Sequence, residues 1–291
     1  MRIALFGTPF PRQYNKYIQH LICKLELENV EILIHQEFYT FLEDEIEFKN
    51  EIETYERITA SDNIDYLFSI GGDGTLLRAV TYVRDSEIPI MGINTGRLGF
   101  ISSISTDQIE VAVNNVLSGN YKLRSRTMLS LDTENNLFGT TNFALNEVAI
   151  VKKDTSSMIR IDAYVDDEFL NSYWADGLLI STPTGSTGYS LSCGGPIIMP
   201  GTENIIIAPI APHNLNVRPI IVNEKSVIKL KVEDRDQLAL VSLDSRSRAF
   251  DSSLELIIRK TEFKINLIEP KDHSFVATIR NKLMWGSDKR N

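Results

Sequence analysis

Residues 66–84 read YLFSIGGDGTLLRAVTYVR, and this stretch decides the fold. Residues 66–70 form the short apolar run typical of a buried strand, and the apolar residues of 75–84 recur at helical spacing. A ligand at the intervening turn would meet the strand's carboxyl end and the helix's free N–H groups together. Those amides attract anions, and glycine removes the Cβ atoms that would hold a phosphate away. The stretch therefore predicts phosphate contacts at Gly71, Gly72 and Thr75.

Asp73 is an unusual residue for such a turn. Its carboxylate sets a negative charge where the backbone already attracts anions. A general base or a metal contact would explain the charge. A tight turn in which Asp73 caps the helix is the alternative, and the pentapeptide alone does not decide between the two.

Strands and helices alternate through the first part of the chain. Strands are predicted at residues 2–6, 30–34, 66–70 and 88–93, and helices at 14–25, 75–84 and 107–117. Such alternation predicts an α/β domain with a parallel sheet and helices on both faces. Ligands gather at the carboxyl ends of such strands, where residues 71–75 and 94–100 lie. The acidic residues 41–56 are interpreted as a solvated helix or mobile segment.

Beyond Tyr121 the apolar period changes to two, as in residues 159–165. Further β-rich runs lie at 143–151, 178–182, 205–210, 227–232, 238–243 and 254–267. They predict an all-β C-terminal domain, as a sandwich or as layered antiparallel sheets. The expected division is an α/β domain at 1–120, a β-rich domain at 121–270, and a C-terminal helix at 271–291 that packs on the first domain.

Composition excludes several classes of function. The 291 residues carry 30 Lys and Arg against 39 Asp and Glu, a net charge of −9, which argues against nucleic acid or acidic lipid as a partner. Cys23 and Cys193 form neither a disulfide framework nor a metal-ligand spacing. The chain lacks a signal-peptide pattern and an apolar run of about 20 residues. We therefore expect a cytoplasmic protein without a membrane partner.

Three polar features interrupt the β-rich half. Residues 182–196 are dense in hydroxyls and glycines, which suits an oxygen-rich ligand or, alternatively, a plain surface loop. Asn146 and Glu147 interrupt an apolar run, where buried polar groups cost free energy unless paired. Their partner could be a base edge or ribose, or they could form an internal pair or an edge-strand bulge. Asp176 is a carboxylate at a loop edge, with a turn or cap as the alternative.

Five segments in order along residues 1–219 together resemble the NAD kinase family. They are residues 71–75 (GGDGT), 94–100 (NTGRLGF), 145–147 (LNE), 176–177 (DG) with 182–187 (TPTGST), and 211–219 (APHNLNVRP). The first segment alone is shared with lipid kinases of the diacylglycerol and sphingosine type. The other four point to NAD kinase.

The resemblance implies transfer of the γ-phosphoryl group of ATP to the 2′-hydroxyl of the adenosine ribose of NAD. Asp73 would accept the hydroxyl proton, with Gly74 close to the same substrate. Asn146 and Glu147 would bind the adenosine part, and Asp176 the nicotinamide end. Further contacts to the dinucleotide would come from Thr187, Gly188, Tyr189, Ser190, Leu191, Ser192 and Ala211.

The same resemblance implies the remaining partners. Mg²⁺ is expected to arrive on the phosphates of ATP, with no metal ligand assigned to the chain itself. Arg78 could contact phosphate or be an ordinary solvated helix arginine. A homodimer or homotetramer is expected.

The chain departs from the family pattern at four places. Gly188 and Cys193 stand where relatives often have alanine, and Trp174 stands where some have arginine. Residues 243–246 read LDSR where many relatives have Asp-Gly-Gln, so Asp244 and Arg246 are left out of the expected site.

Three rival functions are weaker. A lipid kinase would show an apolar route to its substrate, and Asp73 argues against a dinucleotide sensor without turnover. A dehydrogenase is disfavoured because the sequence contains no Gly-x-Gly-x-x-Gly motif, and a Walker A motif is also absent.

Overall fold

Strand β4 (Tyr66–Ile70) leads through the glycine turn into helix α3 (Asp73–Val83), as the sequence predicts, although the helix begins two residues earlier than expected. The computed structural model describes residues 1–96, 99–153, 157–233 and 238–286. The chain divides into two units. The first is Met1–Ser125 with Ile265–Asn291, and the second is Arg126–Lys264.

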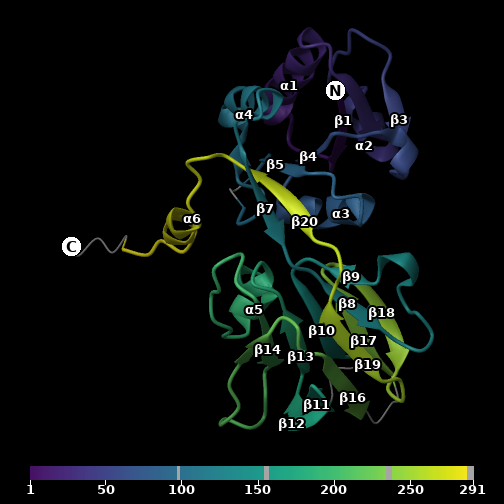
Figure 1. Ribbon diagram of the computed structural model, residues 1–291, viewed down its shortest axis with the longest axis vertical. Helices are drawn as coiled ribbons and strands as arrows, with labels where there is room; N and C mark the ends of the chain where they lie inside the picture. The colour runs from purple at the N-terminus through teal and green to yellow at the C-terminus, as the bar shows by residue number, and fades with distance from the viewer. Residues whose placement is uncertain (97–98, 154–156, 234–237, 287–291) are drawn as a thin grey trace. The chain divides into compact units, whose positions relative to one another are not determined.

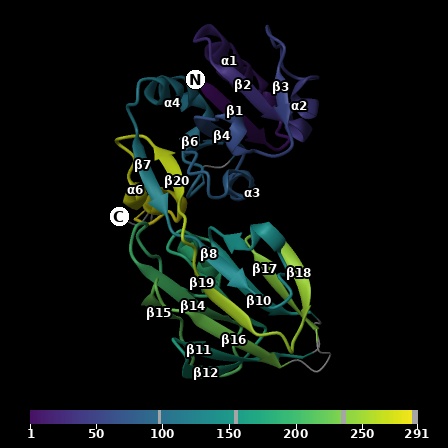
Figure 2. The same ribbon diagram turned by 45° about the vertical axis from the view of Figure 1, so that its right-hand side comes forward.

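The first unit is built on one mainly parallel sheet, in the order β3-β2-β1-β4-β5-β20-β7, with β6 paired to β5 (Figures 1 and 2). Adjacent strands from β3 through β5 to β20 pair in parallel. The predicted parallel sheet is therefore confirmed. Its strands are β1 (Arg2–Gly7), β2 (Glu31–His35), β3 (Glu53–Tyr55), β4, β5 (Ile90–Asn94), β6 (Ile104–Ser105), β7 (Lys122–Arg126) and β20 (Ile265–Glu269).

Helices cover this sheet on both faces. The apolar sides of α1 (Asn15–Leu27), α2 (Gln36–Leu42) and α4 (Ile109–Leu117) share one core with alternate strand residues such as Ile3 and Leu5. Helix α3 packs against β1, β4 and β5 from the opposite face. Alternation along the strands produces the two faces, because successive side chains point to opposite sides of a sheet.

The acidic segment 41–56 differs from its expectation. Helix α2 ends in it, and β3 extends the sheet at its edge by pairing with β2. Glu53 points to solvent while Tyr55 is buried and donates a hydrogen bond to the Leu5 carbonyl at 3.2 Å. The predicted solvated helix is wrong beyond Leu42, where exposed turns lead into β3. A strand can form there because an edge strand tolerates charge on its outer side and needs few apolar residues.

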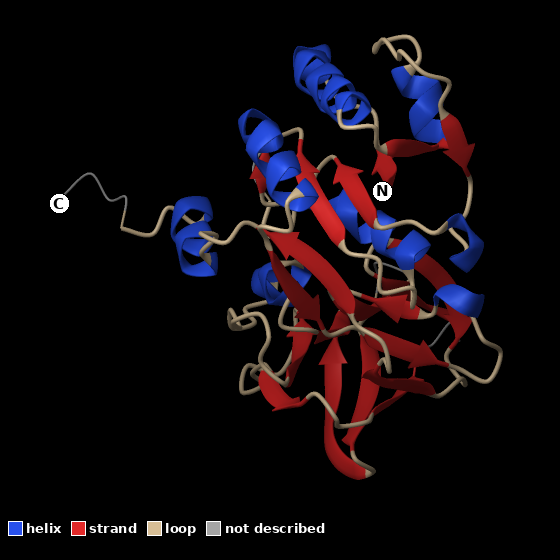
Figure 3. Cartoon of the chain, turned by 45° about the horizontal axis from the view of Figure 1, so that its top comes forward, coloured by secondary structure: helices blue, strands red, loops and turns tan. Residues whose placement is uncertain are grey.

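The second unit is a sandwich of two six-stranded antiparallel sheets. Strands, drawn in red, predominate in this unit in Figure 3. One sheet has the order β15-β14-β13-β10-β17-β18 and the other β12-β11-β16-β19-β8-β9. Side chains from both sheets form one apolar core, which includes Ile150 and Ile180 from the first and Ile161 and Ile258 from the second. The prediction of an all-β sandwich is confirmed.

The strands of the first sheet are β10 (Glu147–Lys152), β13 (Gly177–Ser181), β14 (Asn204–Ile210), β15 (Ile220–Asn223), β17 (Leu238–Leu243) and β18 (Arg246–Asp251). Those of the second are β8 (Leu129–Asp132), β9 (Phe143–Ala144), β11 (Ile159–Val165), β12 (Glu168–Ala175), β16 (Ile228–Glu233) and β19 (Leu256–Lys260). Helix α5 (Tyr189–Ser192) lies outside both sheets.

Two predicted strands are each divided in the structure. The run 143–151 forms β9 and β10, which belong to different sheets, and the chain crosses between the sheets at Leu145 and Asn146. The run 254–267 forms β19 in the sandwich and β20 in the parallel sheet. Helix α6 (Phe275–Lys282) follows in the first unit, where the Lys282 ammonium lies 4.6 Å from the centre of the Phe100 ring.

In the described part of the chain, no helix combines the length and apolar character that crossing a membrane requires.

Candidate active site

The glycine turn requires glycine at its first position. Gly71 has φ +150°, and a Cβ there would lie 2.3 Å from the Thr75 hydroxyl oxygen. By contrast, a Cβ on Gly72 or Gly74 would meet no heavy atom within 4 Å. The space beside these two exposed glycines is open, so a ligand can approach the amide end of α3. The Thr8 and Thr75 hydroxyls lie 2.9 Å apart beside the same turn, and Thr8 is a neighbour that the sequence did not single out.

Asp73 does not cap its own helix. Its carboxylate instead accepts three backbone hydrogen bonds, from Phe100 at 2.8 Å, Ile101 at 3.2 Å and Ser102 at 2.9 Å. A Cβ on Gly99 would lie 1.8 Å from Asp73 Oδ1, so the carboxylate keeps its place only with glycine at position 99. The alternative of a simple cap is wrong, because the carboxylate joins the start of α3 to a loop that follows the next strand.

This loop begins with the second motif, residues 94–100, and continues to Ser102. Asn94 is buried, and its side chain accepts a hydrogen bond from the Gly96 amide at 2.8 Å and donates to the Ser102 carbonyl at 3.4 Å. Ser102 also donates from its hydroxyl to the Gly71 carbonyl at 3.2 Å. The motif's Arg97 and Leu98 lie outside the described residues. The two motifs are thus connected by hydrogen bonds at the carboxyl edge of the sheet.

Arg78 lies on α3 with its guanidinium 5.6 Å from the centre of the Phe6 ring and 3.9 Å from the Glu37 carboxylate. Its side chain is 47% exposed. Stacking on an aromatic ring holds the arginine while leaving donors available. The expected role of Arg78 in phosphate binding stays a prediction.

In the second unit, Asn146 and Glu147 lie where the chain crosses from one sheet to the other. The Thr182 amide donates to the Asn146 carbonyl at 2.9 Å, and the Thr182 hydroxyl donates to the Leu145 carbonyl at 2.6 Å. Two side-chain oxygens, Asn146 Oδ1 and Glu147 Oε2, are buried and have no hydrogen-bond partner among the described residues. They do not form the internal pair considered as an alternative.

Burial, and after it the nearby Asp244 carboxylate, raise the pKa of Glu147 to about 8, against the lowering effect of a hydrogen bond from the Tyr189 amide. A carboxyl group with such a pKa holds its proton at neutral pH. It can therefore donate a hydrogen bond as well as accept one.

The hydroxyl-rich segment lies directly against this pair. A Cβ on Gly188 would be 3.2 Å from Glu147 Oε2 and 3.3 Å from Asn146 Nδ2. Ser190 Oγ is a third buried oxygen without a partner in the described part of the chain. A plain surface loop would not bury such groups. The structure thus gathers Asn146, Glu147, Gly188, Tyr189 and Ser190 at one place.

Other hydroxyls of the segment serve the fold. The Ser186 hydroxyl donates to the Pro183 carbonyl at 2.7 Å and accepts from the Ile198 amide at 3.0 Å. The Thr187 hydroxyl donates to the Thr184 carbonyl at 3.2 Å. On α5, Leu191 is half-buried and Ser192 is exposed.

Asp176 and Ala211 lie at neighbouring strand ends. Asp176 pairs with the Lys152 ammonium at 2.6 Å, and its amide donates to the Ile210 carbonyl at 3.0 Å. Ala211 has φ +44°, a left-handed conformation that a residue with a Cβ rarely adopts.

Burial raises the pKa of Tyr189, and negative charge at Cys193 and Asp176 adds to this increase.

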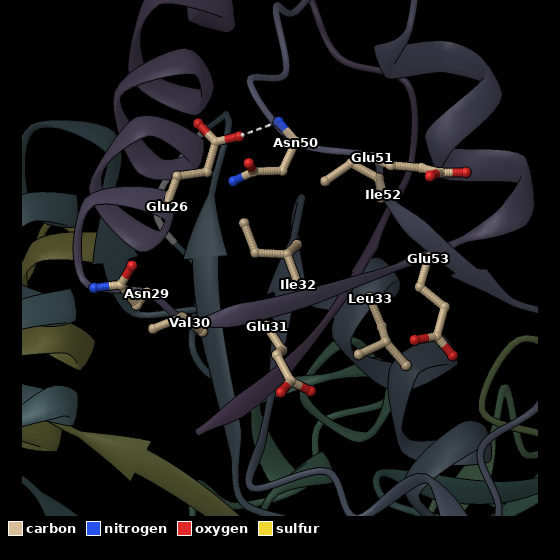
Figure 4. A pocket seen from close by; sticks show the side chains of 10 residues that line it. All are labelled: Glu26, Asn29, Val30, Glu31, Ile32, Leu33, Asn50, Glu51, Ile52 and Glu53. Atoms are coloured by element: carbon tan, nitrogen blue, oxygen red, sulfur yellow. Dashed lines mark hydrogen bonds between the residues drawn. The ribbon is translucent and has the colours of Figure 1, made fainter.

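A pocket of about 400 Å³ lies elsewhere in the first unit, between the end of α1, β2 and the chain leading into β3 (Figure 4). Four glutamates line it, and two of these, Glu31 and Glu53, pair with Arg2. It contains none of the expected site residues, and its negative charge would repel phosphate. In the described residues, no group of three His, Cys, Asp or Glu could hold a metal ion.

An open glycine turn at the amide end of a helix is typical of proteins that bind phosphate groups, and comparison with known proteins identifies the family. The model described as the ATP-NAD kinase N-terminal domain matches residues 17–121, and that of the ATP-NAD kinase C-terminal domain matches residues 145–269. An NAD kinase of Cytophaga hutchinsonii is 49% identical over 292 residues that cover 100% of both chains. The chain belongs to the NAD kinase family and is therefore a kinase.

Two solved structures are similar in fold. A yeast NADH kinase complexed with NADH has a TM-score of 0.87 at 23% identity, covering 99% of this chain and 88% of its own. An NAD kinase from Archaeoglobus fulgidus in complex with ATP has a TM-score of 0.75 at 27% identity, covering 98% of this chain and 99% of its own. Both likenesses confirm the α/β and all-β arrangement expected from the sequence.

Proposed function

We propose that this kinase transfers the γ-phosphoryl group of ATP to the 2′-hydroxyl of the adenosine ribose of NAD, giving NADP and ADP. Family membership supports the reaction, and one structural observation supports the acceptor. Three buried oxygens, on Asn146, Glu147 and Ser190, have no partner among the described residues. Buried polar groups without partners are costly, so their presence is best explained by a polar ligand that satisfies them.

Asp73 is proposed as the proton acceptor for the 2′-hydroxyl. A carboxylate has about four lone-pair positions. Oδ1 accepts from Ile101 and Ser102, and Oδ2 accepts only from Phe100. One position therefore remains on Oδ2 for the substrate hydroxyl, while the three amides fix the carboxylate's orientation. As the hydroxyl oxygen attacks the γ-phosphorus, its proton passes to Asp73 and the bond to ADP breaks.

Phosphate contacts are assigned to the glycine turn. The amide end of α3, exposed at Gly72 and Gly74, provides donors and a favourable dipole, and Thr8 and Thr75 add hydroxyls beside it. Gly71 is retained because its conformation and the space below it exclude a side chain. Arg78 adds a cation one turn along the helix.

Mg²⁺ is proposed to enter on the phosphates of ATP. In proteins Mg²⁺ usually keeps several waters and is bound through substrate phosphates, so the nucleotide and water would supply most of its ligands. When bound, Mg²⁺ would neutralise charge on the transferred phosphoryl group.

The second unit is proposed to bind the dinucleotide. Asn146 and Glu147 would hold the adenosine part, and Asp176 the nicotinamide end. Tyr189 is 43% exposed, and its ring is available to pack against a planar group. Thr187, Gly188, Ser190, Leu191, Ser192 and Ala211 would complete the contacts.

A cytoplasmic homodimer or homotetramer is proposed for the assembled protein. Phe169, Trp174 and Ile221 are at least half exposed on the second unit. Large apolar side chains of this kind are typical of surfaces that another subunit covers.

The test is an assay with NAD and γ-labelled ATP that follows label into NADP. A parallel arm with diacylglycerol in vesicles tests a lipid kinase, and calorimetric titration with NAD in the absence of ATP tests a sensor. We expect label in NADP alone. Label in lipid, or NAD binding without turnover, would contradict the proposal.

A further inference from the structure

Asp244 lies in the turn between β17 and β18, with φ +52°. Its carboxylate accepts backbone hydrogen bonds from Leu145 at 3.0 Å, Asn146 at 2.7 Å and Glu147 at 3.2 Å. Its own amide donates to the Glu147 carbonyl at 3.0 Å. A side chain nearly 100 residues away along the chain thus holds three successive amides.

These amides belong to the crossing between the two sheets of the sandwich. Only Glu147 of the three residues is in a strand, so the crossing lacks the regular sheet partners that most backbone N–H groups use. Removing the carboxylate would leave buried donors without acceptors, which is a costly change. The crossing therefore depends on Asp244 for its conformation.

Arg246 secures the chain just before the crossing. Its guanidinium donates to the carbonyls of Thr141 and Phe143, and lies 5.6 Å from the centre of the Phe143 ring. Asp244 and Arg246 therefore both bind the main chain of residues 141–147. Arg246 binds main-chain carbonyl groups, and Asp244 binds main-chain amide groups. These contacts exist only because the sandwich fold brings this turn beside residues 141–147.

We propose that Asp244 is a positioning residue for the dinucleotide site, because it fixes the backbone from which Asn146 and Glu147 present their unpartnered oxygens beside Gly188. The inference rests on the proposed function, in which Asn146 and Glu147 hold the adenosine part of NAD. Asp244 itself does not touch the substrate in this proposal. Its role is to hold two contact residues in a single arrangement before the ligand arrives.

Electrostatics supports the same role. Burial raises the pKa of Asp244, while the hydrogen bonds from three amides and the charge of Arg246 act in the opposite direction and stabilise its ionised form. After burial, the negative charge of an ionised Asp244 is the second cause that raises the pKa of Glu147 and favours its protonated state. Among the residues that the structure describes, Tyr189 and Cys193 also face Glu147, and their own pKa values are raised by burial and by Glu147.

The test compares Asp244→Asn with wild type in steady-state kinetics and in NAD titrations from pH 6 to 9. The asparagine loses an acceptor and the charge, so we expect the KM for NAD to rise about tenfold, with kcat changed less than about threefold. The pH midpoint of NAD affinity should also move down by about one unit, because Glu147 loses a neighbouring negative charge. A residue with only a structural role would not move this midpoint.

Asp162→Asn is the matched control. Asp162 is a half-buried carboxylate of the second sheet that accepts from Arg160 at 2.9 Å and from the Ser172 hydroxyl. We expect this variant to lower the unfolding temperature without changing the KM for NAD or the pH midpoint. An equal change in KM in both variants would overturn the inference, since the effect would then follow general loss of stability.

Arg246→Lys provides a second variant if Asp244→Asn does not fold. A lysine cannot bind two carbonyls with a planar group, so we expect the KM for NAD to rise about threefold. Wild-type KM in this variant, or wild-type KM and pH midpoint in Asp244→Asn, would overturn the inference. If wild type itself did not bind NAD, the proposed function would fail first, and the two failures are thereby distinguished.

Discussion

Asp73 and Asp244 bind the main chain in the same way, but the relation between carboxylate and loop is opposite. Each accepts three successive backbone N–H groups from a distant segment. At Asp73 the loop orients the carboxylate, which lies beside open space at Gly72 and Gly74. At Asp244 the carboxylate orients the loop, which carries Asn146 and Glu147. The bonding pattern alone therefore does not assign a role, and the surroundings do.

The largest effect is expected at Asp73, where the carboxylate is the proposed reacting group. Asp73→Asn should lower kcat by about 10³-fold, because the substrate hydroxyl loses its proton acceptor. NAD affinity should stay within a few-fold of wild type in a calorimetric titration. Asp85→Asn, at an exposed carboxylate just beyond α3, is the control and should leave kcat unchanged. A fully active Asp73→Asn would refute the proton-acceptor assignment.

The next effect tests whether the loop orients the Asp73 carboxylate. In Gly99→Ala the new Cβ would lie only 1.8 Å from the present position of Asp73 Oδ1. The substitution should therefore displace the carboxylate. A displacement of this size should reduce kcat by about 10²-fold. Gly96→Ala is a matched control, since its Cβ would meet only Asn94 Oδ1 at 3.7 Å. Similar kinetics for the two alanine variants would break the comparison.

A smaller effect should appear in stability as a function of pH. The pKa of Glu147 is raised to about 8 in the folded protein, so the folded state binds the proton more tightly than the unfolded state. Stability should therefore fall as pH rises from about 5 to 8 and level off above that, by at most about 1.4 kcal/mol per pH unit. Chemical denaturation across this range measures it. In Glu147→Gln the fall should be shallower, and an identical profile would contradict the raised pKa.

The smallest effect is expected at Gly188, which lies beside Asn146 and Glu147. The new Cβ would lie 3.2 Å from both Glu147 Oε2 and the Gly185 carbonyl oxygen, so these groups must move by only a few tenths of an ångström. Gly188→Ala should change the KM for NAD by about twofold or less. Gly185→Ala gives the contrast, since its Cβ would lie 2.2 Å from the Asn146 carbonyl oxygen, which belongs to the backbone. Equal tolerance at both positions would show that the crossing is not rigid.

Sequence patterns predicted the elements that carry the candidate site. Strand β4 matches its expected residues, and the sandwich follows from period-two alternation. The patterns did not predict β3, because this edge strand carries charged residues. They also predicted one strand where the structure has two strands of different sheets, as in β9 with β10. Apolar runs indicate burial but not the sheet that a strand joins.

The sequence by itself determined the strand, glycine turn and helix around Asp73, because these depend on residues close together in the chain. Only the tertiary structure decided what the two carboxylates bind. Asp73 reaches amides 27 to 29 residues away and Asp244 reaches amides 97 to 99 residues away. Such contacts form when packing brings distant segments together, and no local pattern of residues records them.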